Sequence, residues 1–207
     1  MAENRIFTDE ELKALGARTL DLILSALESG DTKTAGGLSK RMVAEFQGIH
    51  DLYRDWVTHL LSIIGRKYGD EALQDALHET VAGYTRRLAG AYAGKDVKAR
   101  VETLCAGLRG HLQAFEVSED DEAVKITAPV CGSGGRLAAS GAYDGPDGFL
   151  KIKNPQEMTF NRADFPVYCA HCYFQNIVPA GEDGAPLFVT EPSESIGKGA
   201  CKVTIAK

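Results

Sequence analysis

Two cysteines and a histidine occupy four consecutive positions, Cys169-Ala170-His171-Cys172, in a chain with five cysteines and five histidines. Two further cysteines lie at a distance, Cys131 beside a glycine-rich stretch and Cys201 close to the chain end. Thiolates and imidazoles are preferred ligands of zinc, which takes four of them in a tetrahedral arrangement. The spacing therefore predicts a metal site, with zinc or alternatively iron, held by Cys131, Cys169, Cys172 and Cys201.

Other interpretations of these residues remain open. Cysteine is among the most buried residue types, so Cys131 and Cys201 could simply pack within a sheet. A thioredoxin-like pair is disfavoured because no strand and long helix are expected around the motif, and a c-type haem is disfavoured because Tyr173 follows Cys172. His171 is a candidate metal ligand or proton-transfer group, with a surface position as the alternative.

The glycine-rich stretch 131–136, Cys-Gly-Ser-Gly-Gly-Arg, is a candidate anion site. Successive backbone N–H groups in such a segment can form a nest for an anion, and an arginine fork can grip a carboxylate. We therefore expect Arg136 to act on the substrate and Ser133 to contact it. The alternative is an ordinary turn between strands, and the spacing matches neither a P-loop nor a dinucleotide fingerprint.

A further candidate, His50, lies within an apolar stripe with spacings of three and four residues. This period predicts a helix that ends near Ile64 and turns one face towards the core. His50 is a candidate general base, although a histidine on such a face is often only a core residue. Tyr53 lies one turn onward and Trp56 at the edge of the face, so we expect these three to line a pocket. His59 is expected to point to another face of the helix, and His78 and His111 are expected to be exposed or structural.

The sequence pattern changes from helical to strand-like near Phe115, so the candidate residues belong to two kinds of predicted element. Helical periodicity predicts four helices over residues 1–115, the first of them continuous from Thr8 to Gly30. Residues 116–207 contain short alternating runs separated by glycine, proline and asparagine. Strands are expected at 123–128, 149–153, 187–190 and 201–205, and a short helix after Pro166. The chain is therefore predicted to be α+β, with a helical region followed by a small antiparallel sheet that carries a Cys-rich metal-type site, the two regions forming one integrated domain.

The composition and net charge exclude some classes of function. The 207 residues carry a net charge of −6 and are 44% hydrophobic, which suits a globular core and argues against a nucleic-acid partner. The polar residues 1–5 lack the apolar run of a signal peptide, and no window reaches the length of a membrane span. We therefore expect a cytoplasmic protein that binds a small molecule and no membrane, and the apolar helices are compatible with a homodimer.

The cysteine-bearing part of the chain resembles the L-2-amino-thiazoline-4-carboxylic acid hydrolase-like proteins. The resemblance rests on a strand ending at a cysteine, a Pro-x-x-Cys-x-x-Cys segment and a last strand entered through Gly-x-Cys. The chain end is also similar to the last strand of 4-vinyl reductase-type domains. The residues that carry both similarities, over about the last 90 positions, are Cys131, Pro166, Cys169, Cys172, Gly199, Cys201 and Ile205. The resemblance implies a small cytoplasmic hydrolase, or a ligand-binding relative without catalysis. It does not imply that the substrate is the one used by the family.

Two functional hypotheses follow. The first is a metal-dependent hydrolase or lyase acting on a small polar molecule, with His50, His171 and Arg136 as catalytic residues. Three thiolate ligands would leave a position for an activated water, whereas four would close the site. The second is a non-catalytic sensor or binding module, with a structural zinc site and a pocket for a hydrophobic or aromatic ligand.

Overall fold

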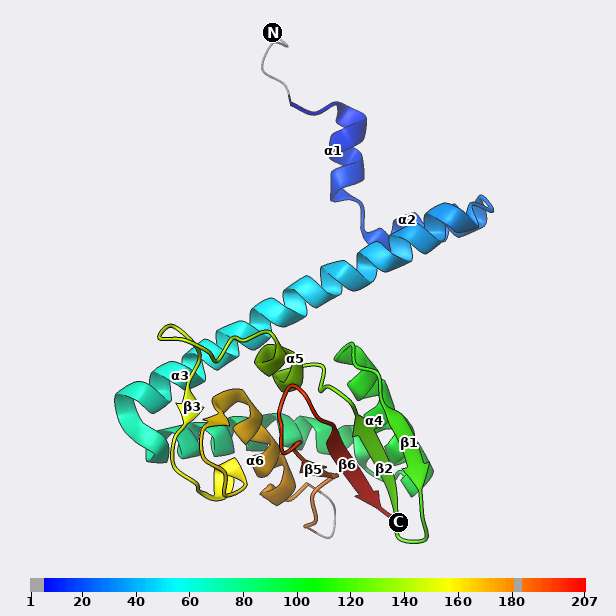
Figure 1. Ribbon diagram of the computed structural model, residues 1–207. Coiled ribbons are helices and arrows are strands. Elements are labelled where there is room, and N and C mark those ends of the chain that lie inside the picture. The colour runs from blue at the N-terminus through cyan, green and yellow to red at the C-terminus, as the bar shows by residue number, and fades with distance from the viewer. Residues whose placement is uncertain (1–5, 181–183) are drawn as a thin grey trace. The chain divides into compact units, whose positions relative to one another are not determined.

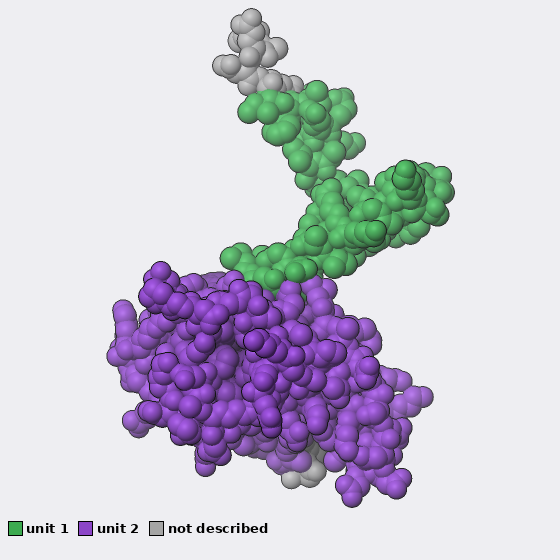
Figure 2. Space-filling view, viewed as in Figure 1, with its two compact units in different colours: residues 1–52 green, residues 53–207 purple. Residues whose placement is uncertain are grey.

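The computed structural model describes residues 6–180 and 184–207. The chain forms two compact units, residues 1–52 and 53–207, which Figure 2 colours separately. The expected α+β class is confirmed; the described residues form six α-helices, and four of them lie before residue 116, where four were expected, although their bounds differ from the expected ones. The division between the units falls inside a helix, whereas residue 116 marks the change from helix to strand. Residues 1–5, on which the expectation about a signal peptide rested, lie outside the described residues.

The first unit contains α1 (Asp9–Gly16), α2 (Thr19–Glu28) and the first part of α3 (Thr32–Tyr92) (Figure 1). A single helix was expected over α1 and α2, but the backbone becomes extended at Ala17. A reciprocal capping box between Thr8 and Glu11 fixes the start of α1. In α2, Ile23 and Ala26 are buried, and the hydroxyl of Thr19 donates to the Glu45 carboxylate at 2.6 Å.

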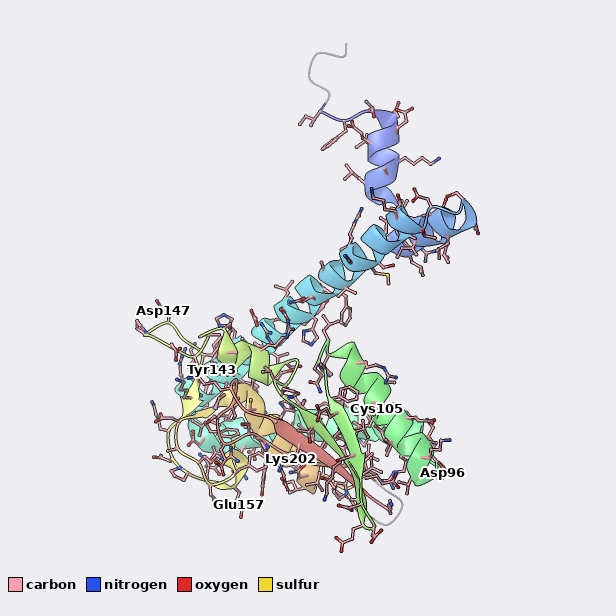
Figure 3. All side chains as sticks on the ribbon, turned by 45° about the vertical axis from the view of Figure 1, so that its right-hand side comes forward. Asp96, Cys105, Tyr143, Asp147, Glu157 and Lys202 are labelled. Atoms are coloured by element: carbon pink, nitrogen blue, oxygen red, sulfur yellow. The ribbon has the colours of Figure 1, made fainter. Side chains whose placement is uncertain are left out.

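The second unit begins with the remainder of α3, followed by α4 (Val97–Gly110). The helical backbone of α3 is interrupted at Gly69, where φ is +85°, a value that glycine adopts without steric cost. The Asp96 carboxylate accepts a hydrogen bond from the Ala99 N–H at 2.8 Å and so caps α4. Figure 3 shows Asp96 at the start of α4 and Cys105 farther along it. The inner face of α3 is buried over Thr58, Leu61, Leu73, Leu77 and Val81.

The main sheet has four antiparallel strands in the order β1-β2-β6-β5. They are β1 (Glu116–Glu119), β2 (Ala123–Ala128), β5 (Val189–Glu191) and β6 (Cys201–Ala206). The central pair β2–β6 runs from Ala123 opposite Ala206 to Ala128 opposite Cys201. Ile126 and Ile205 pack with Leu104 and Cys105 of α4, so this helix covers one face of the sheet. Two of the expected strands, 123–128 and 201–205, are therefore confirmed almost to the residue.

The segment between β2 and β5 builds the rest of the core. It contains α5 (Gly134–Ala139), β3 (Lys151–Ile152), the 3₁₀ turn η1 (Glu157–Thr159), β4 (Phe165–Pro166), the 3₁₀ turn η2 (Val167–Ala170) and α6 (His171–Ile177). The strands β3 and β4 pair with each other and not with the main sheet. The expected helix after Pro166 is confirmed, whereas α5 lies where the glycines had predicted a turn or nest. Among residues 6–180 and 184–207, no helix is both long and apolar enough to cross a membrane.

Candidate functional site

A cavity of about 280 Å³ lies within the second unit. Helices α3 and α4, the sheet, and the segment that begins α6 all contribute to its lining. Much of its wall is apolar, with side chains from Leu88, Leu104, Leu108, Ile126, Phe188 and Val203. Polar side chains also line it, namely His111, Gln113, Ser133, Tyr168, His171 and Gln175.

All four cysteines singled out by the sequence line this cavity: Cys131, Cys169, Cys172 and Cys201. The β2–β6 register sets Cys201 opposite Ala128, three residues before Cys131. Asn176 ties α6 to the edge strand β5, because its side-chain amide donates to the Thr190 carbonyl at 2.8 Å and accepts from the Thr190 N–H at 2.7 Å. Sheet pairing and this amide clamp together bring the cysteines, which are up to 70 residues apart in sequence, to one cavity.

Three of the thiols at the cavity, those of Cys169, Cys172 and Cys201, are held in their neutral form. Burial raises the pKa of Cys169 well above its usual value, and the neighbouring Cys172, Cys131 and Cys201 thiols raise it further. Burial also raises the pKa of Cys172 to about 12. The pKa of Cys201 is raised for the same reason, although the Ser193 N–H, 3.4 Å from its Sγ, opposes the shift. These thiols are therefore poor nucleophiles at neutral pH, because the thiolate is the reactive form.

His171 is neutral as well, and its tautomer follows from its contacts. Its Nδ1 lies 2.5 Å from the Tyr168 carbonyl oxygen, which can only accept, so Nδ1 carries the proton. Nε2 is then the acceptor that faces the Cys172 thiol, 3.6 Å from Sγ. Burial lowers the pKa of His171, which outweighs the opposing effect of the carbonyl. His171 and Cys172 thus form a neutral hydrogen-bonded pair rather than an imidazolium–thiolate pair.

The glycine-rich stretch is folded back on the end of α4. The Gly132 N–H donates to the Gln113 side-chain oxygen at 2.6 Å, and Ser133 Oγ lies 2.8 Å from His111 Nδ1. Arg136 Nε donates to the Gly132 carbonyl at 2.6 Å, so part of the guanidinium is engaged within its own segment. Ser133 is therefore at the cavity, as the sequence analysis expected, whereas Arg136 is not among the residues that line it.

Gly132 and Gly134 lie so close to neighbouring segments that a larger residue would clash at either position. A Cβ on Gly132 would lie 2.1 Å from the His111 carbonyl oxygen, and a Cβ on Gly134 would lie 2.6 Å from Cys169 Sγ. Both distances are shorter than any ordinary non-bonded contact. The glycines that suggested an anion nest therefore allow α4, α5 and the Cys169 segment to pack against each other.

The expected metal site is not formed in this arrangement. Within the described residues, no three His, Cys, Asp or Glu side chains are placed so that they could hold one ion together. The four cysteines share a cavity without converging on a point. Zinc or iron ligation therefore remains a proposal that would require these side chains to reorient.

The other expected pocket residues are not among the described residues that line the cavity. His50 belongs to the first unit, where its Nδ1 contacts the Asp51 carboxylate at 2.9 Å and its ring contacts Phe46. Tyr53 and Trp56 stack on each other with ring centroids 6.1 Å apart. Their exposed fractions are 55% and 59%, and neither is among the described residues that line the cavity. The expectation of a pocket lined by these three residues, on a face turned to the core, is therefore not met.

The cavity is also lined by residues that the sequence pattern did not predict. His111 had been expected to be exposed or structural, but it contacts Ser133 and lines the cavity at the end of α4. Tyr168 lies beside the cysteines, and burial raises its pKa to about 12. Its position directly before Cys169 could have suggested a role, whereas no local signal distinguishes His111.

Comparison with known proteins found no matching family model, no matching curated protein and no matching solved structure. The resemblance to the hydrolase-like family is therefore an expectation from the cysteine pattern alone.

Proposed function

We propose that the second unit is a binding module for a compact, uncharged and largely apolar small molecule. The observation that carries this proposal is the cavity of about 280 Å³, with largely apolar walls and a few polar side chains in its lining. A cavity of roughly 150 Å³ is enough to bind benzene, so this one suits a ligand of one or two rings. A few polar groups in an otherwise apolar pocket are typical of sites that orient such ligands.

The protonation states support an uncharged ligand. The pKa of His171 is lowered and those of Cys169 and Cys172 are raised, so these groups carry no charge at neutral pH. Transfer of an isolated ion into such surroundings is costly without an opposite charge. A hydroxyl or ring N–H on the ligand could instead pair with His111, Ser133 or the Tyr168 hydroxyl.

The proposal is tested by filling the cavity from α4. Gly107 lines the cavity, and a Cβ at this position meets no atom within 4 Å, so a larger side chain can start there without a clash. With indole as probe at tenfold its Kd, we expect the wild-type melting temperature to rise by about 3–5 °C, since ligand binding adds about 1.4 kcal/mol. In Gly107→Leu, this rise is expected to disappear because the side chain occupies the ligand volume.

The matched control is Gly110→Leu, on the same helix, where a Cβ is equally unobstructed but the residue does not line the cavity. Its indole response should equal that of the wild type. Benzoate, of similar size but charged, should give a much smaller shift. An unchanged response in Gly107→Leu, or no indole response in the wild type at millimolar concentration, would overturn the proposal.

A metal-dependent hydrolase or lyase is the second candidate, supported by the presence of all four cysteines around one cavity. Elemental analysis of protein purified without a histidine tag tests this candidate. If it is correct, about one equivalent of zinc or iron is present in the wild type and lost in both Cys169→Ser and Cys172→Ser. Less than about a tenth of an equivalent in the wild type would exclude it, while the indole result would be unaffected.

A further inference from the structure

We infer that α3 pairs with α3 of a second copy of this chain, so that the protein is a homodimer. The residues concerned are large, apolar and exposed: Met42, Phe46 and Ile49 in the first unit, and Tyr53, Trp56, Leu60 and Ile63 in the second. Their spacings along the sequence alternate strictly between four and three residues. This alternation over three heptads is the a/d pattern of helices that pack as a coiled coil.

In the second unit, the opposite face of α3 is already occupied by the protein itself. In the second unit, Thr58 and Ser62 are 0% and 1% exposed, and Arg54 and Leu61 are also buried. By contrast, the apolar residues from Tyr53 to Ile63 named above are 45–59% exposed. From Tyr53 to Ile63 the helix therefore turns one face to its own core and an apolar face away from it.

The composition of the exposed face favours an identical helix as its partner. No Asp, Glu, Lys or Arg occupies any of the seven positions, so nothing on the face requires a charged partner. A seam with a 3.5-residue repeat needs a helix with the same repeat, and a second copy provides one of matching length. Isologous contacts of this kind, in which one patch pairs with itself, are the commonest basis of dimers.

The exposed apolar area on this face of α3 is sufficient for a dimer interface. Val43, Leu52 and Val57 flank the seven residues on α3 and are 44–62% exposed. Together the ten side chains offer on the order of 900 Å² per chain, compared with about 800 Å² per partner in a stable interface. The face is also broader than a strict a/d seam, which is the pattern expected for a helix that packs in a bundle.

The experiment measures mass and fluorescence of the full chain between 1 and 100 µM. Sedimentation or light scattering should give twice the chain mass of 22.3 kDa. Trp56 is the only tryptophan and lies within the seam, so its emission should shift to the blue as the dimer forms and to the red on dilution. Ile49→Glu is expected to raise the dimer Kd by about 100-fold or more, because it places a carboxylate in an apolar interface.

Gln47→Glu is the matched control, since it introduces the same side chain at an exposed α3 position outside the seam. It should leave the dimer Kd within about threefold of the wild type. A wild-type monomer at 100 µM would overturn the inference, and so would equal effects of Ile49→Glu and Gln47→Glu. A monomer whose Trp56 emission is blue-shifted at every concentration would show that another part of the same chain covers the face. The cavity and its proposed ligand do not enter into this test.

Discussion

Gly132→Ala is expected to lower the free energy of unfolding by about 3 kcal/mol, at the upper end of the cost of overpacking. The added Cβ would lie 2.1 Å from the His111 carbonyl oxygen and 3.0 Å from Gln113 Cβ. The first of these is backbone, so the clash cannot be relieved by rotating a side chain. The Gly132 N–H is also held at 2.6 Å by Gln113, and moving the segment would break that hydrogen bond.

Chemical denaturation monitored by circular dichroism measures this effect. The control is Gly110→Ala, where a Cβ meets no atom within 4 Å in the last turn of α4. That variant should be as stable as the wild type or up to about 1 kcal/mol more stable, because alanine is the better helix former. Loss of indole binding should accompany the destabilisation in Gly132→Ala, since displacing this segment moves His111 and Ser133. Equal stability of the two variants would contradict the packing described for Gly132.

Phe174→Ala is expected to cost about 3–5 kcal/mol, as for other buried phenylalanines. Phe174 is 1% exposed and lies on α6, two residues after Cys172. Its ring contacts His78 of α3 with centroids 6.1 Å apart, and Tyr173 at 5.3 Å. Removing the ring leaves a cavity beneath the helix that carries His171 and Cys172.

The same helix provides the control for this variant. Ile177 is 48% exposed, so Ile177→Ala should change stability by less than about 1 kcal/mol. A second measurement follows the thiols: Cys172 should react with a thiol reagent at least tenfold faster in Phe174→Ala than in Ile177→Ala, because local opening of α6 exposes it. If both variants unfold at the same denaturant concentration, Phe174 does not anchor α6.

The strands were the elements that the sequence predicted best. In β2, residues 123–128 have a hydrophobic face on Val124 and Ile126 and place Lys125 outward, and the structure has the strand at these residues. The break between α1 and α2 was not predicted, because leucines continue through it at a helical period. Periodicity reports which side chains share a face, whereas the ends of a helix depend on caps and on local backbone angles.

The apolar stripe of α3 shows a second limit of prediction from sequence periodicity. Its period correctly predicted a helix with one continuous apolar face, but we expected that face to turn to the core and to line a pocket with His50, Tyr53 and Trp56. In the structure Tyr53 and Trp56 are exposed, and the buried positions are the polar Thr58 and Ser62 together with Leu61. A hydrophobic period identifies an apolar surface that is buried by packing. It does not indicate whether that surface packs against the same chain or against a second copy.

The sequence by itself determined the fold class, the two central strands and the cysteines that gather at one site, because alternation, helical period and residue type are local properties of the chain. Only the tertiary structure decided what surrounds those cysteines. Sheet register brought Cys201 close to Cys131, the Asn176 clamp tied α6 to β5, and Gly132 and Gly134 allowed close approach. Burial then raised the thiol pKa values, and His111 joined the cavity through a contact 22 residues distant in sequence. These effects depend on long-range packing and desolvation, which no short stretch of sequence encodes.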